Sequence, residues 1–163
     1  MKKLLIFTLI LSSLICVSGC GDIYRYFFSG EISKAIRKEI VDKHSKRINI
    51  AQLTHFEWDN FFIFGAYEPL NELCDVLERY HVDRLYCEAE IGRYSLMDDG
   101  KRLLVFLNKG NIVYTEMPTG YYGQFDAEYH PFNPKNAIFD VVIDKKSTYH
   151  DGSSVTDLKP IIK

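Results

Sequence analysis

Four cysteines are the side chains of this 163-residue sequence with the widest range of chemistry, and they fall into two pairs. A cysteine sulfur can carry a covalent group, join a second cysteine or bind a soft metal ion. Cys16 and Cys20 lie in and just after an apolar stretch near the start, whereas Cys74 and Cys87 lie in the middle of the chain. The surroundings of each pair decide which reaction the sequence favours.

Cys20 follows a segment with the layout of an export signal. Met1-Lys2-Lys3 is basic, Leu4 to Val17 is an apolar run of 14 residues, and Ser18 and Gly19 are small. This order is typical of a secretory signal peptide. The motif Val17-Ser18-Gly19-Cys20 also resembles the lipobox of bacterial lipoproteins. The resemblance implies cleavage between Gly19 and Cys20 and a diacylglyceryl thioether on the Cys20 sulfur, which anchors the chain to a membrane.

Two other interpretations of the N-terminus are a permanent transmembrane helix and an ordinary secreted protein cut near Gly19. A helix of this length spans only ~21 Å, and the hydrocarbon core requires about 20 residues. Lipoproteins of Gram-negative bacteria stay at the inner membrane when Asp directly follows the lipidated cysteine. Gly21 holds that place here and Asp22 comes one residue later. The resemblance therefore implies the periplasmic side of the outer membrane, or the cell membrane in a host without one.

Cys74 and Cys87 are the two cysteines that remain after this processing. Cysteines of exported proteins commonly form disulfides, and a bond here would close a loop of about 14 residues, worth roughly 3 kcal/mol on the chain-entropy model. Two buried free thiols are one alternative. A metal site with His81 is another, but two thiolates and one imidazole make a poor zinc site in an oxidising compartment. We expect a disulfide, with no metal and no cofactor.

The sequence contains no motif with catalytic spacing. There is no Gly-x-Ser-x-Gly nucleophile elbow, and the five histidines are scattered without ligand spacing. Gly120 and Gly123 flank tyrosines and are not followed by the Lys-Ser or Lys-Thr pair of a phosphate-binding loop. An enzyme acting on envelope material is an alternative that requires a pocket containing Glu88, Glu90 or His130.

Residues 118–134 form a long connection rich in aromatic side chains. Long irregular connections are often functional, and tyrosine-rich loops suit recognition because their rings give rigid contact area at low entropic cost. The alternative is that the rings fold back and close the core. Since the only charges are Asp126 and Glu128, a binding segment would suit a protein or glycan. The candidate binding residues are Tyr121, Tyr122, Phe125, Tyr129, His130 and Phe132.

Length and charge predict one acidic domain. Removing residues 1–19 from the 163 leaves 144, and the loss of Lys2 and Lys3 leaves 18 basic against 22 acidic residues, a net charge of −4. This length forms one domain with a full core, and an acidic domain does not suit nucleic acid. We expect residues 20–30 to be an aromatic-rich lipidated tether and residues 31–163 to be a single α+β domain.

The expected domain is a mainly antiparallel sheet of about five strands with two helices packed on one face. The helices are Glu31–Arg47, whose basic face is either solvated or in contact with anionic headgroups, and Pro69–Arg79, which is followed by a connection over Tyr80–Glu90. Apolar runs predict the strands. Asp99-Gly100 and Lys109-Gly110 predict the turns between them. The strands are Phe56–Tyr67, buried on both faces, Ile91–Asp98, Lys101–Asn108, Asn111–Met117, and Ala137–Lys145 with one wet face; the tail 146–163 is polar.

Over residues 56–143 the chain resembles a small family of bacterial exported proteins without an assigned activity. The residues that carry the likeness are Trp58 to Pro69 with Glu72-Leu73-Cys74, Gly100 to Val113, and Phe132-Asn133-Pro134 with Asn136-Ala137. The resemblance supports the order of elements and implies no catalytic residue.

The function that the sequence favours is a non-catalytic, membrane-anchored lipoprotein that binds a protein partner in the periplasm. The alternatives are an immunity or inhibitor lipoprotein against a secreted toxin, an envelope-acting hydrolase, and a structural part of envelope assembly.

Overall fold

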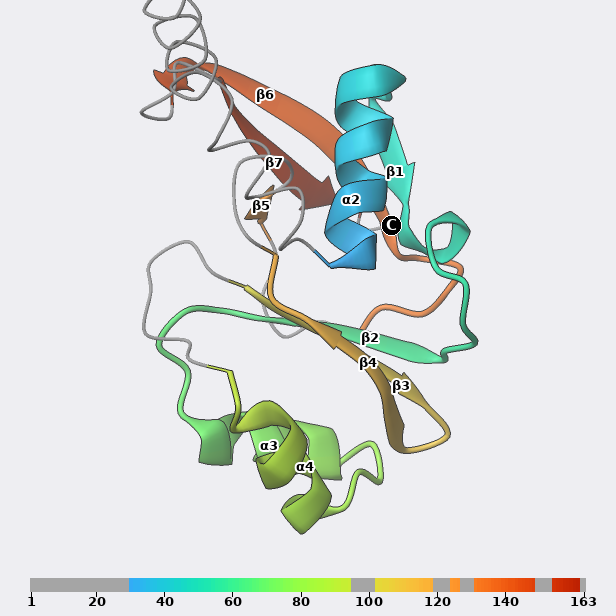
Figure 1. The fold of residues 1–163 in the computed structure, drawn as a ribbon, viewed down its shortest axis with the longest axis vertical. Coiled ribbons are helices and arrows are strands. Elements are labelled where there is room, and N and C mark those ends of the chain that lie inside the picture. Colours follow the sequence, from blue (N-terminus) through green and yellow to red (C-terminus); the bar gives the residue numbers. More distant parts are fainter. Residues whose placement is uncertain (1–29, 95–101, 119–123, 127–130, 149–153, 162–163) are drawn as a thin grey trace, which may run out of the picture.

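The computed structural model describes residues 30–94, 102–118, 124–126, 131–148 and 154–161, which form an α+β fold (Figure 1). Its strands make two sheets, so the expected single sheet of about five strands is wrong. Sheet A contains four strands in the order β1-β6-β7-β5, and sheet B contains three in the order β2-β3-β4. Among the described residues, no helix is both long enough and apolar enough to cross a bilayer.

Sheet B is antiparallel and consists of β2 (Asn60–Phe64), β3 (Leu103–Asn108) and β4 (Asn111–Glu116). Strand β3 is central, as its continuous apolar sequence predicts. The predicted Lys109-Gly110 turn joins β3 to β4, and Gly110 is required there for two reasons. Its φ is +78°, and a Cβ at this position would lie 3.0 Å from the backbone oxygen of His81.

Sheet A consists of β1 (Arg47–Asn49), β6 (Ile138–Thr148), β7 (Ser154–Pro160) and the two-residue β5 (Gln124–Phe125). Strands β1 and β7 pair antiparallel to β6, and β5 pairs parallel to β7. Strand β6 matches the predicted strand over residues 137–145, whereas β7 lies in the tail for which no strand was expected. The alternation along β6 holds only in part, since Phe139 is buried and Ile143 is 53% exposed.

The helices differ from the prediction in number and in place. Helix α2 (Glu31–Arg37) continues as one π-helical turn (Lys38–Asp42) and ends before the predicted Arg47, where β1 begins. Helix α3 (Leu70–Glu78) agrees with the predicted helix and has Pro69 at its N-cap. A third helix, α4 (Arg84–Ile91), occupies the stretch expected to be a connection.

Helix α4 also overturns the expected strand that would begin at Ile91, because Ile91 is the last residue of the helix. Asp83 is the N-cap of the helix, and its side chain accepts a hydrogen bond from the backbone N–H of Tyr86 at 2.9 Å. Such a cap satisfies one of the free N–H groups of the first turn. The predicted turn Asp99-Gly100 and the rest of that predicted strand beyond Tyr94 lie outside the described residues.

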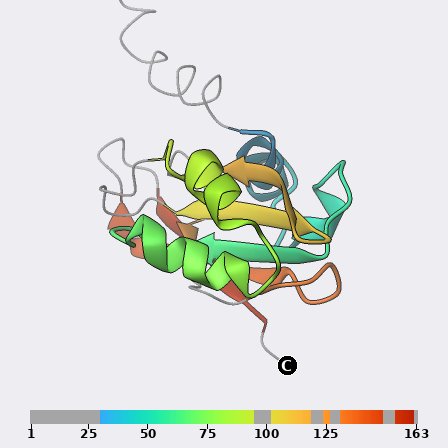
Figure 2. The same ribbon diagram turned by 90° about the horizontal axis from the view of Figure 1, so that it is seen from below.

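Sheet B lies between two layers and is buried on both faces (Figures 1 and 2). One face carries Phe61 and Phe106 and packs against α2 and sheet A; the other carries Phe62 and Val105 and packs against α3 and α4. We call these packed regions the first core and the second core. The helices therefore cover opposite sides of sheet B, because apolar side chains along β2 and β3 point to both faces and each face needs a cover.

The first core is built around stacked and edge-on phenylalanine rings. The ring centroids of Phe61 and Phe106 are 4.4 Å apart, and Phe125 and Phe132 each lie 5.1 Å from Phe139 of sheet A. Phe61 and Phe132 also exchange two backbone hydrogen bonds of 2.7 and 2.8 Å. Residue 132 thus joins β2 of sheet B to the segment that leads into sheet A.

Candidate functional site

The predicted lipidation site lies outside the described residues, together with the rest of the signal segment and most of the tether. Cys20 and Gly19 therefore remain predictions. The same holds for Tyr121, Tyr122, Tyr129 and His130 of the aromatic connection, which also lie outside the described residues.

The two described rings of the aromatic connection lie in the first core. Phe125 is 1% exposed and packs edge-on against Phe139, and Phe132 is 5% exposed and lies beside Phe61. For these two side chains the packing follows the alternative in which the rings close the core, so neither presents its ring at the surface.

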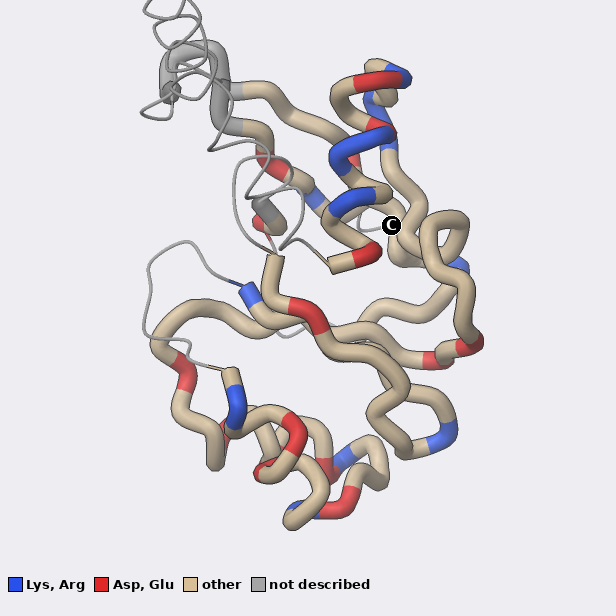
Figure 3. Tube along the Cα trace, viewed as in Figure 1, with Lys and Arg blue, Asp and Glu red and all other residues tan. Residues whose placement is uncertain are grey.

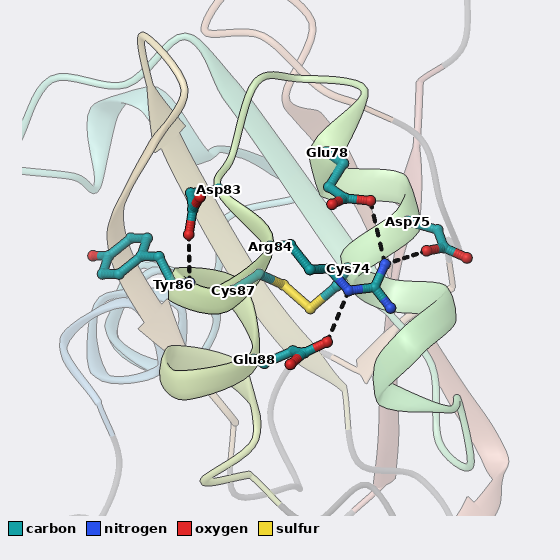
Figure 4. Close-up of polar contacts among 8 residues, drawn as sticks. All are labelled: Cys74, Asp75, Glu78, Asp83, Arg84, Tyr86, Cys87 and Glu88. Carbon is teal, nitrogen blue, oxygen red and sulfur yellow. Dashed lines mark hydrogen bonds and ion pairs between the residues drawn. A yellow bond between two sulfur atoms is a disulfide. The ribbon is translucent and has the colours of Figure 1, made fainter.

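The disulfide between Cys74 and Cys87 is confirmed. The sulfur atoms are 2.01 Å apart, both residues are fully buried, and the bond joins α3 to α4 (Figure 4). The sulfurs are bonded to each other, so the alternatives of two free thiols and of a metal site with His81 do not apply. Within the described ranges, no group of three or more His, Cys, Asp or Glu residues is arranged to hold a metal ion.

A second cross-link between α3 and α4 is electrostatic and centres on Arg84 (Figure 4). Its guanidinium contacts Asp75 and Glu78 of α3, the latter at 3.2 Å, and its Nε donates to Glu88 of α4 at 2.8 Å. The hydrogen bond to Glu88, and to a lesser extent the one to Asp75, raises the pKa of Arg84 above its usual value. Covalent and ionic links therefore hold the two helices as one rigid hairpin.

Two carboxylates that the hydrolase alternative requires are paired with arginines. Glu88 accepts from Arg84, and Glu90 lies 2.8 Å from Arg93. The third residue of that alternative, His130, is outside the described part. Among the described residues, therefore, Glu88 and Glu90 do not form a pocket with a carboxylate free of an arginine partner.

The outer surface of the α3–α4 hairpin carries exposed apolar side chains. Leu85 and Tyr86 of α4 are 75% and 41% exposed, and Val113 of the adjacent strand β4 is 41% exposed. The Tyr86 hydroxyl donates at 3.2 Å to the backbone oxygen of Ile112, the residue before Val113. We call Leu85, Tyr86 and Val113 the hairpin patch. Single exposed apolar residues are ordinary, but neighbouring ones on a rigid element are typical of interaction surfaces.

The open edge of β4 is closed by tyrosines. Tyr86 donates to Ile112 O, and the Tyr94 hydroxyl lies 3.3 Å from Thr115 O and 2.8 Å from Thr115 Oγ1. Unpaired carbonyls on an edge strand invite pairing with another chain. The two hydroxyls satisfy such carbonyls, so a partner at this face would meet side chains instead of a free strand edge.

The start of α2 is fastened to sheet B through Glu116, a buried carboxylate at the end of β4 that is 5% exposed. Glu116 accepts hydrogen bonds from the backbone N–H groups of Ile32 at 3.0 Å and Ser33 at 2.9 Å, from the Ser33 hydroxyl, and from the Tyr114 hydroxyl at 2.7 Å. A Cβ on Gly30 would lie 2.1 Å from the Glu116 carboxyl carbon. We call Gly30, Ser33, Tyr114 and Glu116 the N-terminal clamp.

Burial, and then the hydrogen bond to Glu116, raise the pKa of Tyr114, so its hydroxyl stays protonated and donates to the carboxylate. The same hydroxyl oxygen accepts from the backbone N–H of Glu31 at 3.1 Å. Sequence reasoning missed this cluster because its partners lie more than 80 positions apart along the chain. The clamp fixes the residue at which the predicted tether joins the domain.

The described residues also line two surface hollows. One, of about 490 Å³, is lined by Phe62, Val76, Arg79 and Tyr80. The other, of about 360 Å³, is lined by residues of the segment 51–58 together with Asn108 and Pro134. The second hollow contains Thr54 and Glu57, but the Thr54 hydroxyl donates to the backbone oxygen of Ala51 at 3.4 Å and accepts from the Trp58 ring N–H at 3.0 Å.

Comparisons with protein-family models, with curated proteins and with solved structures found no match to this chain.

Proposed function

We propose that this chain is a membrane-anchored lipoprotein of the bacterial envelope that faces the periplasm and binds a protein partner through the hairpin patch. The anchor is a lipid on Cys20, and residues 20–30 tether it to the domain of residues 31–163. The partner contact is non-catalytic and uses Leu85, Tyr86 and Val113.

The observation that carries this proposal is the buried Cys74–Cys87 disulfide. Stable disulfides form in oxidising compartments and are rare in the cytosol, where thiols are kept reduced. The bond therefore supports export, and export is what the basic start, the apolar run and the lipobox-like motif predict together.

The hairpin patch supports the binding part of the proposal. The disulfide and Arg84 hold α3 against α4, so a partner does not have to order the surface before it binds. A rigid surface lowers the entropic cost of association, and tyrosine is enriched among the residues that dominate binding energy.

The anchor is tested by the mass of the mature protein purified from membranes. We expect an N-terminal Cys20 carrying a diacylglyceryl group, and a Cys20→Ala variant that is not released from its signal segment by lipoprotein processing. An unmodified Cys20 on a processed chain would overturn the anchored assignment, while the fold and the hairpin patch would be unaffected.

The partner surface is tested by a photo-crosslinking amino acid placed at Leu85 in cells. We expect a discrete adduct whose partner is the same in repeated experiments and which is lost when Tyr86→Asp is added. The matched control is Ile143, an apolar residue of β6 that is also more than half exposed. Equal adducts from positions 85 and 143, or none from position 85, would contradict a binding role for the hairpin patch.

A further inference from the structure

Charge is divided between the two sides of sheet B. Residues 30–47, which include α2 and β1, contain six basic and three acidic side chains, whereas residues 68–94, which include α3 and α4, contain three basic and seven acidic ones. Figure 3 shows basic positions along α2 and at β1, and acidic positions gathered around α3 and α4. We call residues 30–47 the basic end.

Two lysines of the basic end form no ion pair within the described ranges. Lys43 pairs with Glu39, and Arg47 pairs with Asp140 at 3.0 Å. Lys38 and Lys46 are exposed and form no ion pair with any residue in the described part of the chain. Lys38 projects from the side of the helical segment opposite to Ile36 and Ile40, which are buried in the first core. Its charge therefore faces away from the domain.

The basic end is also the end nearest to the predicted anchor. Gly30 precedes α2 and lies ten positions after Cys20 in the sequence. A fully extended segment of that length spans at most ~33–36 Å. The N-terminal clamp fixes the place where this segment meets the domain, so the lipid holds the basic end within a short distance of the bilayer.

We propose that the basic end lies against an anionic phospholipid surface and that the α3–α4 hairpin points away from it. This inference rests on the proposed lipid anchor. The lipid supplies attachment, and the attraction of Lys38 and Lys46 for phosphate-bearing headgroups supplies orientation. The acidic hairpin is repelled by the same surface, so both halves of the charge distribution favour one orientation.

The experiment uses the lipidated protein, purified from membranes and reconstituted on the outer surface of vesicles. One set of vesicles contains phosphatidylglycerol, and the other contains only phosphatidylcholine. A water-soluble acylating reagent modifies exposed lysines, and mass spectrometry gives the rate at each position. We expect severalfold slower acylation of Lys38 and Lys46 on the anionic vesicles than on the neutral ones. At about 1 M salt, where the Debye length is about 3 Å, the difference should disappear.

Lys109 is the internal control, because it is exposed on the β3–β4 turn beside the loop between α3 and α4. Its rate should be the same on both vesicles. The double variant Lys38→Glu, Lys46→Glu should remain attached through its lipid. Its Lys43 should be acylated at the same rate on the anionic and the neutral vesicles. The matched control is Lys135→Glu, an exposed lysine outside the basic end, which should behave as the wild type.

Equal rates at Lys38 and Lys46 on the two vesicle types, with the lipid present on Cys20, would overturn the orientation and leave the anchor intact. Protection of Lys109 together with Lys38 would overturn it too, because it would indicate adsorption without a preferred face. Protection in whole cells but not on vesicles would assign the basic end to an acidic protein instead of a membrane. Absence of the lipid would remove the anchored assignment and this inference with it.

Discussion

At the scale of single residues, the carboxylate of Glu116 has a dense set of hydrogen-bond partners. It accepts from two backbone N–H groups of α2 and from the hydroxyls of Ser33 and Tyr114, and it is almost completely buried. The first N–H groups of a helix have no partner within the helix. Here they are satisfied from another layer of the fold, so the carboxylate joins α2 to β4.

Replacing Glu116 with Ala should destabilise the domain by about 2–3 kcal/mol, because it leaves buried donors of α2 unsatisfied. Ser33→Ala is the matched control. It removes one hydroxyl but keeps the backbone hydrogen bonds, and should cost about 1 kcal/mol. Urea unfolding monitored by circular dichroism measures both. An equal effect of the two substitutions would show that Glu116 does not hold the helix start.

Tyr114 should make the domain more sensitive to alkali. Its pKa is raised in the folded protein, so above the usual tyrosine value of about 10 the unfolded chain releases this proton while the folded chain keeps it. The unfolded state then binds fewer protons, and stability falls as the pH rises. We expect Tyr114→Phe to flatten the decline in the free energy of unfolding above about pH 10. A decline as steep as that of the wild type would contradict this account.

At the residue scale, the sequence was sufficient to predict the disulfide but not the clamp. Cys74 and Cys87 are the only cysteines left after the predicted processing, so their pairing follows from export. Glu116 ends a strand in a sequence with no unusual feature, and its partners come from a helix 83 and 84 positions earlier. Local patterns carry no information on a contact of that separation.

At the scale of secondary-structure elements, the outer edge of β4 is protected by α4 and the residues that follow it. The hydroxyls of Tyr86 and Tyr94 bind carbonyls of Ile112 and Thr115. Without these hydroxyls, β4 would present unpaired carbonyl groups at the edge of sheet B.

The double variant Tyr86→Phe, Tyr94→Phe should therefore self-associate more than the wild type, because it opens an edge strand and keeps the aromatic rings. Sedimentation over a range of concentrations measures this. Tyr80→Phe is the control, since the Tyr80 ring packs on Phe62 at 4.8 Å in the second core and lies away from that edge. Sedimentation of the double variant identical to that of the wild type would show that the hydroxyls do not guard the edge.

The elements that the sequence predicted are those with strong local signals. The continuous apolar runs of β2 and β3, the turn at Lys109-Gly110 and the proline before α3 each mark an element without reference to the rest of the chain. Helix α4 was missed because its apolar residues do not share one face. Cys87 and Ile91 are buried, whereas Leu85 is 75% exposed. Strand β1 has only three residues, and β7 is polar at alternate positions; both are held in place by β6.

At the scale of the whole molecule, sheet B belongs to both cores. Side chains of β3 alternate between them, with Leu104 and Phe106 in the first and Leu103, Val105 and Leu107 in the second. A change in either core therefore alters the strand that supports the other. Continuous apolar runs predicted that β2 is buried on both faces and that β3 is central. They could not show which layer covers which face, since that depends on contacts between distant segments.

The shared strand predicts a single unfolding transition. Trp58, the only tryptophan, packs on Phe106 in the first core, so its fluorescence reports that core, whereas far-ultraviolet circular dichroism reports the helices on both sides. Phe106→Ala should cost about 3–5 kcal/mol and Leu103→Ala about 2–5 kcal/mol. Each should shift both signals by the same amount. Two separated transitions would show that the cores fold independently.

The late position of β7 has a consequence for the route by which the molecule is made. Leu158 is fully buried in the first core, and β7 links β6 to β5, so the core is complete only when residues close to the C-terminal end of this sequence have joined it. A chain that emerges with its N-terminus first presents α2 and sheet B before β7. Contacts between segments far apart in sequence, such as those of Leu158 with the α2 residues of the first core, are slow to form. The first core would thus stay open until β7 has emerged, and would close only afterwards.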